Sequence, residues 1–118
     1  MPILIAGTID FDPARAKAAI EDGKPYIEAS RREDGCVAYN WALDPLVPGR
    51  VHVYEEWRDE AALAGHFRDE SYTSMRDHLG KYGLTGSSVR KYRCDAVATV
   101  YDEEGRPRAD FQTAAATA

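Results

Sequence analysis

The sequence predicts an α+β fold of the ferredoxin-like type, with the element order β-α-β-β-α-β and one antiparallel sheet. The first observation is that four segments have the apolar pattern of strands: residues 3–11, 36–43, 50–57 and 89–101. The second is that helical periodicity separates the first segment from the second, and the third from the fourth. The third is the length of 118 residues, which allows a single core and therefore one domain.

The first strand-like segment, residues 3–11, is apolar at almost every position, so we expect a strand that is covered on both faces. Asp12 and Pro13 then predict a helix start, because Asp accepts from free first-turn amides and Pro suits the first helical position. Small and apolar residues keep one helical phase beyond Pro25, which should break or kink a helix. We therefore expect an interrupted helix that ends near Arg32.

Residues 36–43 alternate small with bulky side chains, which places Tyr39 and Trp41 on one face of a strand. Proline and glycine residues within 44–49 predict a turn, and residues 50–57 then return as the second strand of a hairpin. We expect Tyr39 and Trp41 to belong to a dimer interface. The alternative is that they line a pocket.

The second helical region is expected to consist of two short helices. Asp59 suits the N-cap of a helix over residues 60–69, and a further helix is expected over residues 71–82. The folded domain is expected to span residues 1–102. Residues 103–118 form a C-terminal extension that ends in small residues, so we expect this extension to be partly mobile.

His66 is directed at an apolar surface, because it shares one face of the first short helix with Ala62 and Leu63. That surface lies beside the strand that ends in Trp57. An ionisable group in such a place indicates either a pocket or a structural histidine whose hydrogen bonds are satisfied within the fold.

Composition excludes several classes of function. The net charge of −5 disfavours nucleic acid and an anionic membrane as partners, since both bind basic surfaces. No apolar run approaches the roughly 20 residues that span a bilayer, and the first residues lack a basic leader, so we expect a cytoplasmic protein. Cys36 and Cys94 are then expected to be reduced and buried. Ligand-like spacing of His and Cys and a glycine-rich phosphate loop are both absent, so neither a metal nor a cofactor is expected.

The sheet is expected to have one face that the helices leave uncovered. The first two strands carry bulky apolar residues on both faces, although helices can cover only one face of a four-stranded sheet. An uncovered apolar face of that size indicates a surface that binds a partner. The simplest closure is a homodimer in which two sheets pack face to face.

Four motifs resemble the antibiotic biosynthesis monooxygenase superfamily: Glu33-Asp34-Gly35-Cys36, Tyr54-Glu55-Glu56-Trp57, Ala62-Leu63-Ala64-Gly65-His66 and Asp69-Glu70-Ser71-Tyr72. The resemblance is to quinol monooxygenases in particular. It implies a dimeric α+β barrel that oxidises its substrate without a cofactor. Haem-degrading members carry Asn on the first strand and Trp on the helix, whereas this chain has Gly7-Thr8 and His66 there, which disfavours haem as a ligand.

His66 is the candidate catalytic residue, because a neutral imidazole can accept a phenolic proton. In the alternative interpretation, His66 packs against the sheet and bonds a strand carbonyl or Glu55. The candidate substrate-binding residues are aromatic: Trp57, Tyr72, Tyr54 and Phe67. Trp57 also suits a place in the core. His78 is expected to face solvent.

The sequence thus predicts a cofactor-independent monooxygenase that oxidises a quinol or another small phenolic substrate with O2. Two alternatives remain open at this point. One is a non-catalytic dimer of the same fold that binds a small aromatic or phenolic molecule. The other is an isomerase or lyase that acts on a small metabolite, with His66 as its base.

Overall fold

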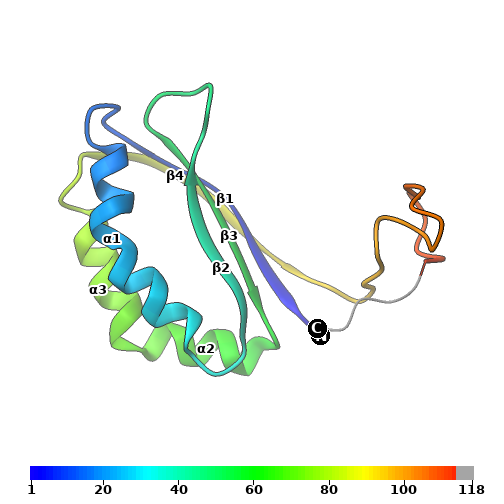
Figure 1. Ribbon diagram of the computed structural model, residues 1–118. Helices are drawn as coiled ribbons and strands as arrows, with labels where there is room; N and C mark the ends of the chain where they lie inside the picture. Colours follow the sequence, from blue (N-terminus) through cyan, green and yellow to red (C-terminus); the bar gives the residue numbers. More distant parts are fainter. Residues whose placement is uncertain (114–118) are drawn as a thin grey trace.

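The computed structural model describes residues 1–113. Its elements are β1 (Ile3–Phe11), α1 (Ala16–Arg31), β2 (Cys36–Leu43), β3 (Arg50–Trp57), α2 (Glu60–Arg68), α3 (Glu70–Leu79) and β4 (Leu84–Arg93). The strands lie in the order β2-β3-β1-β4, each antiparallel to its neighbours. The helices lie on one face of this sheet (Figure 1). The expected ferredoxin-like α+β fold is confirmed. The sheet is open, and β2 and β4 are its edges.

The first helix differs from its prediction at two points. α1 is continuous from Ala16 to Arg31, so the predicted interruption at Pro25 is wrong. Pro25 is exposed, and the hydrogen bond that its missing N–H removes therefore lies on the side of the helix that water reaches. α1 also begins later than expected, because Asp12 caps a preceding turn: its Oδ1 accepts from the amide of Ala14 at 3.0 Å.

The last strand begins and ends earlier than predicted. β4 spans Leu84–Arg93 and pairs with β1, whereas α3 ends at Leu79. Residues 85–88 are polar or Gly, so nothing in their local pattern indicates a strand, and only the pairing with β1 reveals it. Residues 94–113 leave the sheet and extend away from the body of the fold (Figure 1). The extension that is expected to be partly mobile, residues 103–118, ends in residues 114–118, which lie outside the described residues.

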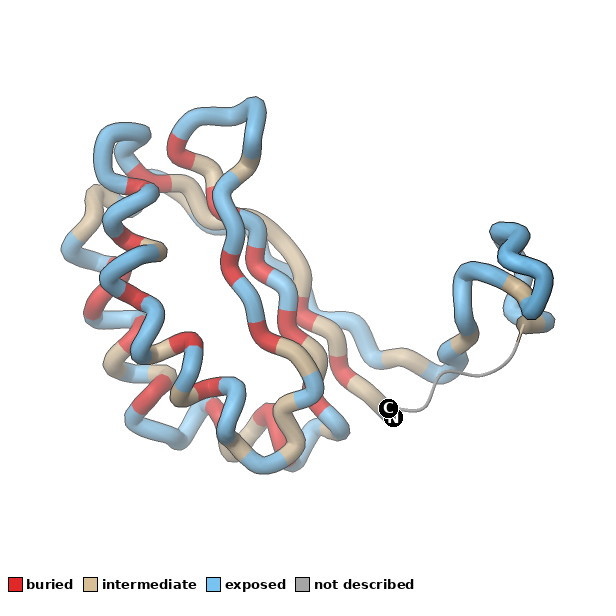
Figure 2. Tube along the Cα trace, viewed as in Figure 1, coloured by how far each residue is buried: buried red, intermediate tan, exposed pale blue. Residues whose placement is uncertain are grey.

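The two faces of the sheet are unlike. The face toward the helices, called the inward face below, carries most of the core, including Ile3, Ile5, Val51, Val53 and Trp57. Along the middle of β2 and along β3, buried positions alternate with more exposed ones (Figure 2). None of the helices α1, α2 and α3 packs against the opposite, outward face (Figure 1). This face mixes apolar with polar side chains, among them Leu4, Ala6, His52, Tyr54, Arg90 and Tyr92.

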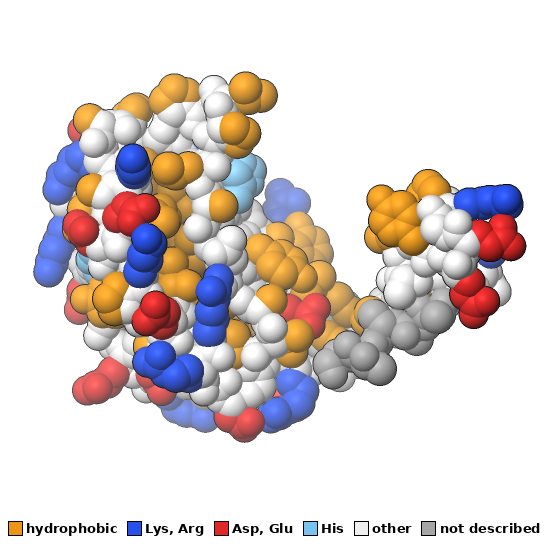
Figure 3. Space-filling model, viewed as in Figure 1, with side chains coloured by type: hydrophobic (Ala, Val, Ile, Leu, Met, Phe, Trp, Pro, Cys, Tyr) orange, Lys and Arg blue, Asp and Glu red, His pale blue; other side chains and the backbone are white. Residues whose placement is uncertain are grey.

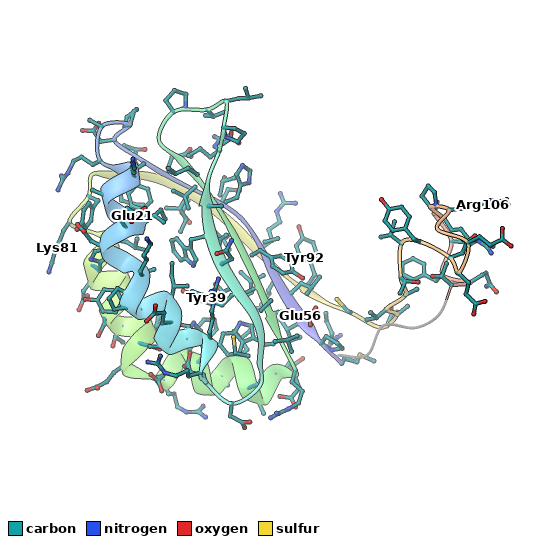
Figure 4. All side chains as sticks on the ribbon, viewed as in Figure 1. Glu21, Tyr39, Glu56, Lys81, Tyr92 and Arg106 are labelled. Atoms are coloured by element: carbon teal, nitrogen blue, oxygen red, sulfur yellow. The ribbon has the colours of Figure 1, made fainter. Side chains whose placement is uncertain are left out.

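Tyr39 and Trp41 belong to the inward face, so the prediction that they form a sheet-face dimer interface is wrong. Both are less than 10% exposed, at 4% and 8%. Figure 4 shows Tyr39 between α1 and the sheet, whereas Glu56 and Tyr92 lie on the other side. The physical reason is that α1 packs over β2 and buries Tyr39 and Trp41, which leaves the small Ala38 and Ala42 outward.

Two further features bear on the sequence expectations. None of the helices within residues 1–113 is long and apolar enough to cross a membrane. Cys36 and Cys94 are free thiols, and both are half-buried rather than fully buried. They lie on opposite edges of the sheet, Cys36 at the start of β2 and Cys94 directly after β4.

Candidate functional site

A cleft of about 320 Å³ lies between the inward face of the sheet and helices α2 and α3. Apolar and aromatic side chains form most of its walls, and the lining includes Ile5, Tyr39, Glu55, His66, Phe67 and Tyr72. Hydrophobic side chains also gather on the visible surface between α1 and β2 (Figure 3). The helices pack mainly over β2 and β3, so the cleft opens along β4, which is exposed at nearly every position.

Paired residues of four strands form the floor of the cleft. Tyr39 pairs with Glu55, and Glu55 pairs with Ile5. The next row along the strands is Trp41, Val53, Gly7 and Val89. Gly7 is required at its position, because a Cβ there would collide with the backbone of β4 at Ser88. The glycine lets β4 approach β1 closely and leaves that part of the floor without a side chain.

His66 is placed in the wall of the cleft by the start of α2. Asp59 caps this helix through its side chain, which accepts from the amide of Ala62 at 2.8 Å. His66 follows Ala62 by four residues and therefore lies on the same buried face of the helix. The His66 side chain is 3% exposed.

The partner of His66 is Glu33, which follows Arg32, the C-cap residue of α1. The Nδ1 atom of His66 lies 2.7 Å from Oε2 of Glu33. With the carboxylate ionised, Nδ1–H donates to it, and the lone pair of Nε2 is then available. Nε2 has no hydrogen-bond partner within residues 1–113. The expected partner in the structural interpretation, a strand carbonyl or Glu55, does not contact His66 by a hydrogen bond in that part of the chain.

Aromatic rings surround the imidazole of His66. The ring centroids lie at 4.4 Å for Trp57, 5.5 Å for Tyr72, 5.7 Å for Phe67 and 5.8 Å for Tyr39. Tyr72, Phe67 and Tyr39 line the cleft. Trp57 is 0% exposed and lies behind the imidazole, so it packs against His66 without reaching the cleft. Tyr54 lies on the outward face, 44% exposed, and the structure does not bring it to the cleft.

Glu55 is a second ionisable group in the cleft. It is 7% exposed, and Nε1 of Trp57 donates to its Oε1 at 3.0 Å. Burial raises the pKa of the Glu55 carboxyl, and the hydrogen bond from Trp57 opposes this effect in part. Burial likewise raises the pKa of the neighbouring Tyr39 hydroxyl, and the charge of Glu55 adds to that rise. The floor of the cleft therefore disfavours charge.

Sequence reasoning missed Glu33 and Glu55 as site residues. Glu33 reads as part of a charged turn, and only the fold brings it to α2. The burial of Glu55 could have been predicted from the sequence. It shares strand parity with the apolar Val53 and Trp57, so its carboxyl must face the core with them. A buried carboxyl between two apolar positions indicates a functional site more strongly than an exposed one.

The remaining histidines lie outside the cleft. The prediction that His78 faces solvent is wrong: it is 8% exposed, and its Nε2 donates to the carbonyl of Ala19 at 3.0 Å, which ties α3 to α1. His52 lies on the outward face, and its Nε2 is 2.6 Å from Oδ2 of Asp44. Within residues 1–113, three or more His, Cys, Asp or Glu side chains nowhere cluster as metal ligands do.

Comparison with known proteins supports the same fold. A protein from Deinococcus radiodurans, assigned to the antibiotic biosynthesis monooxygenases, superposes with a TM-score of 0.75 at 22% identity, over 83% of this chain and 97% of that one. A protein from Pseudomonas aeruginosa gives a TM-score of 0.67 at 26% identity, over 79% and 94% of the two chains.

Comparison of the sequence with known sequences identifies a curated relative and a protein family. An uncharacterised protein from Synechocystis sp. is 36% identical over 67 residues, which are 57% of this chain and 46% of that protein. The match thus spans less than half of the relative's length. The model of the family described as "Antibiotic biosynthesis monooxygenase" matches residues 2–77, well over half of the chain. The chain therefore belongs to the antibiotic biosynthesis monooxygenase family.

Proposed function

We propose that the protein is a cofactor-independent monooxygenase that oxidises a quinol or another small phenol with O2 in the cleft. The observation that carries this proposal is the state of His66. Its imidazole is buried in the wall of an apolar cleft, Nδ1 is bonded to Glu33, and Nε2 has no partner within residues 1–113. Such an imidazole is oriented to accept a proton from a bound hydroxyl.

The chemistry begins with transfer of the phenolic proton to Nε2 of His66. The electron-rich phenolate then gives an electron to O2, and the reduced oxygen and a ring carbon join in a new C–O bond. The resulting peroxide anion takes up the proton held by His66 and becomes a hydroperoxide. The hydroperoxide then eliminates water, which carries away the hydrogen of the oxygenated ring carbon. A quinol and O2 thus yield a hydroxyquinone and water. All four electrons come from the substrate, so no external reductant is required.

Glu33 would act as a positioning residue for His66. Its carboxylate fixes the ring orientation and stabilises the imidazolium that forms when Nε2 takes the proton. The apolar walls would exclude water, which otherwise competes for the phenolate oxygen and for the reduced oxygen species. Phe67 and Tyr72 would provide flat faces for the aromatic ring of the substrate.

We further propose that two copies pair through their outward sheet faces. The outward face is not covered by α1, α2 or α3 and carries apolar side chains, among them Leu4, Ala6, Tyr54 and Tyr92. In such a homodimer both clefts stay open, because each lies on the inward side of its own sheet.

One observation favours a second candidate, an isomerase or lyase. Glu55 and His66 line the same cleft, and burial keeps the Glu55 carboxyl protonated to higher pH than an ordinary glutamate. An imidazole and a carboxyl whose ionisation is disfavoured by burial, placed at one apolar site, suit proton transfer between two positions of an enolisable metabolite. This reaction consumes no O2, which separates it from the first proposal.

Oxygen uptake with isotope labelling tests the proposed function. Purified protein is supplied with 1,4-naphthohydroquinone and 18O2 near pH 6.5, where uncatalysed oxidation is slow. We expect protein-dependent O2 uptake with one labelled oxygen atom in the product and no stoichiometric hydrogen peroxide. Uncatalysed oxidation gives the unlabelled quinone and hydrogen peroxide. If the protein changes neither the rate nor the product over a panel of hydroquinones, the monooxygenase proposal fails.

A further inference from the structure

A second hollow of about 410 Å³ adjoins the cleft along β4. Its apolar side is formed by Ile3, Leu63 and Phe67, and its charged lining consists of Lys91 and Arg93 of β4 and Glu60 of α2. Phe67 lines both the cleft and this hollow, and its ring is 46% exposed. A ligand in the cleft therefore has one neighbouring space into which it can extend past the edge of Phe67.

The strand register places Lys91 in line with the site. Ile5 pairs with Glu55 on one side and with Lys91 on the other, so these three side chains project from the same face of the sheet. Neighbouring strands lie about 4.8 Å apart, and Lys91 is therefore roughly 10 Å from Glu55 between Cα atoms. Glu55 and His66 line the same cleft, so this spacing sets the approximate distance from the site to Lys91. A bicyclic aromatic with polar groups at its two ends has a similar length.

Lys91 is the cation of this hollow that is free to bind a ligand. Within residues 1–113 it has no carboxylate within 4.0 Å, whereas Arg93 contacts Glu60 at 3.3 Å. Arg76 adds a further positive charge to the lining of the cleft from α3. Glu60 offsets the charge of Arg93, so Lys91 and Arg76 leave an excess of positive charge at the mouth of the cleft, although the whole chain carries a net charge of −5. A Lys on an edge strand can also serve to prevent pairing with other strands. In that role, Lys91 would not make the affinity for a ligand depend on the ligand's charge.

We propose that the cleft takes an aromatic ligand with an anionic substituent, and that Lys91 binds this group while the phenolic end lies at His66. The inference rests on the proposed function only in placing an aromatic ligand in the cleft. An ammonium group on a flexible stem suits a carboxylate that lies partly in water. Lys91 then determines specificity and takes no part in the reaction with O2.

The test compares two ligands that differ only in the carboxylate, 6-hydroxy-2-naphthoate and 2-naphthol. Their dissociation constants are measured by calorimetry with the full chain at low ionic strength, without turnover. We expect the carboxylate to bind roughly threefold to tenfold more tightly. Lys91→Met should remove most of this difference. Arg90→Met is the matched control, because Arg90 is the adjacent cation and projects from the outward face; it should leave the difference in place.

Each other outcome overturns the inference in a recognisable way. Equal affinity for both ligands in the unaltered protein would show that the carboxylate of the ligand contributes nothing to binding at the mouth of the cleft. If Lys91→Met and Arg90→Met decrease the difference in affinity equally, that difference arises from the general surface potential and not from a contact with Lys91. If neither 6-hydroxy-2-naphthoate nor 2-naphthol binds, the cleft does not hold aromatic molecules, and both the inference and the proposed function fail. If binding behaves as expected but O2 uptake is absent, only the proposed reaction fails.

Discussion

His66 and Glu33 lie 33 positions apart in the chain, yet Nδ1 of the one is 2.7 Å from Oε2 of the other. The contact joins α2 to the segment after α1 and is made where both side chains are withdrawn from water, at 3% and 12% exposure. A buried hydrogen bond to a charged partner is worth more than an exposed ion pair. It therefore holds the imidazole of His66 in one orientation in the wall of the cleft and leaves Nδ1 occupied by Glu33.

Replacement of His66 should separate its chemical role from a structural one. We expect His66→Ala to lower the oxidation rate by about 10²–10⁴, the usual range for loss of a general base. His52→Ala is the matched control, because His52 lies on the outward face and is 53% exposed; its activity should stay near that of the unaltered protein. Full activity in His66→Ala, with only a lower melting temperature, would assign His66 to the fold alone.

Glu33→Gln tests the positioning role. The amide keeps the shape and a hydrogen-bonding oxygen but no longer stabilises an imidazolium, so we expect kcat to fall about tenfold while KM changes little. Asp34→Asn is the control, since the neighbouring Asp34 pairs with Arg58 at the surface. Steady-state kinetics decide the matter: a rise in KM at constant kcat would contradict a role for Glu33 in proton transfer.

The sequence predicted the order of the elements well and the contacts between them poorly. Strand parity at Val53 and Trp57 and the cap at Asp59 are local signals, and the structure has them as expected. The Glu33–His66 contact depends on how α1 ends relative to α2, and no local pattern reports that. For the same reason the bulky side of β2 could not be assigned to either face, because the burial of Tyr39 and Trp41 depends on α1.

His78 offers a stability prediction that is independent of activity. His78→Ala removes the donor to the Ala19 carbonyl and the ring contacts with Tyr26 and Tyr82. We expect the free energy of unfolding to fall by roughly 1–3 kcal/mol, because a buried acceptor and the surrounding packing lose a partner. Urea unfolding measures this change. A loss as small as that of the exposed His52→Ala would contradict the burial of His78 between α1 and α3.

Glu55→Gln should change the pH dependence of stability in a defined direction. Burial raises the folded-state pKa of Glu55 above its ordinary value of 4.5. The folded protein then holds a proton more tightly than the unfolded chain, so this group's contribution is present below pH 4.5 and declines as pH rises through the folded pKa. We expect Glu55→Gln to be the more stable protein at neutral pH and to match the unaltered protein near pH 4. Urea midpoints across pH 4–8 test this, and a destabilised variant at pH 7 would show that the charged form is favoured.

The outward sheet face should hold a homodimer together. We expect sedimentation at micromolar concentration to give a mass near twice 13.1 kDa. Tyr54→Arg adds a charge to the middle of this face, where the side chain is 44% exposed, so it should dissociate the dimer without unfolding the monomer. Leu46→Arg is the matched control, because Leu46 lies in the loop between β2 and β3 and is 88% exposed. A monomer in the unaltered protein would overturn the dimer, and dissociation by Leu46→Arg alone would move the interface to the hairpin loop.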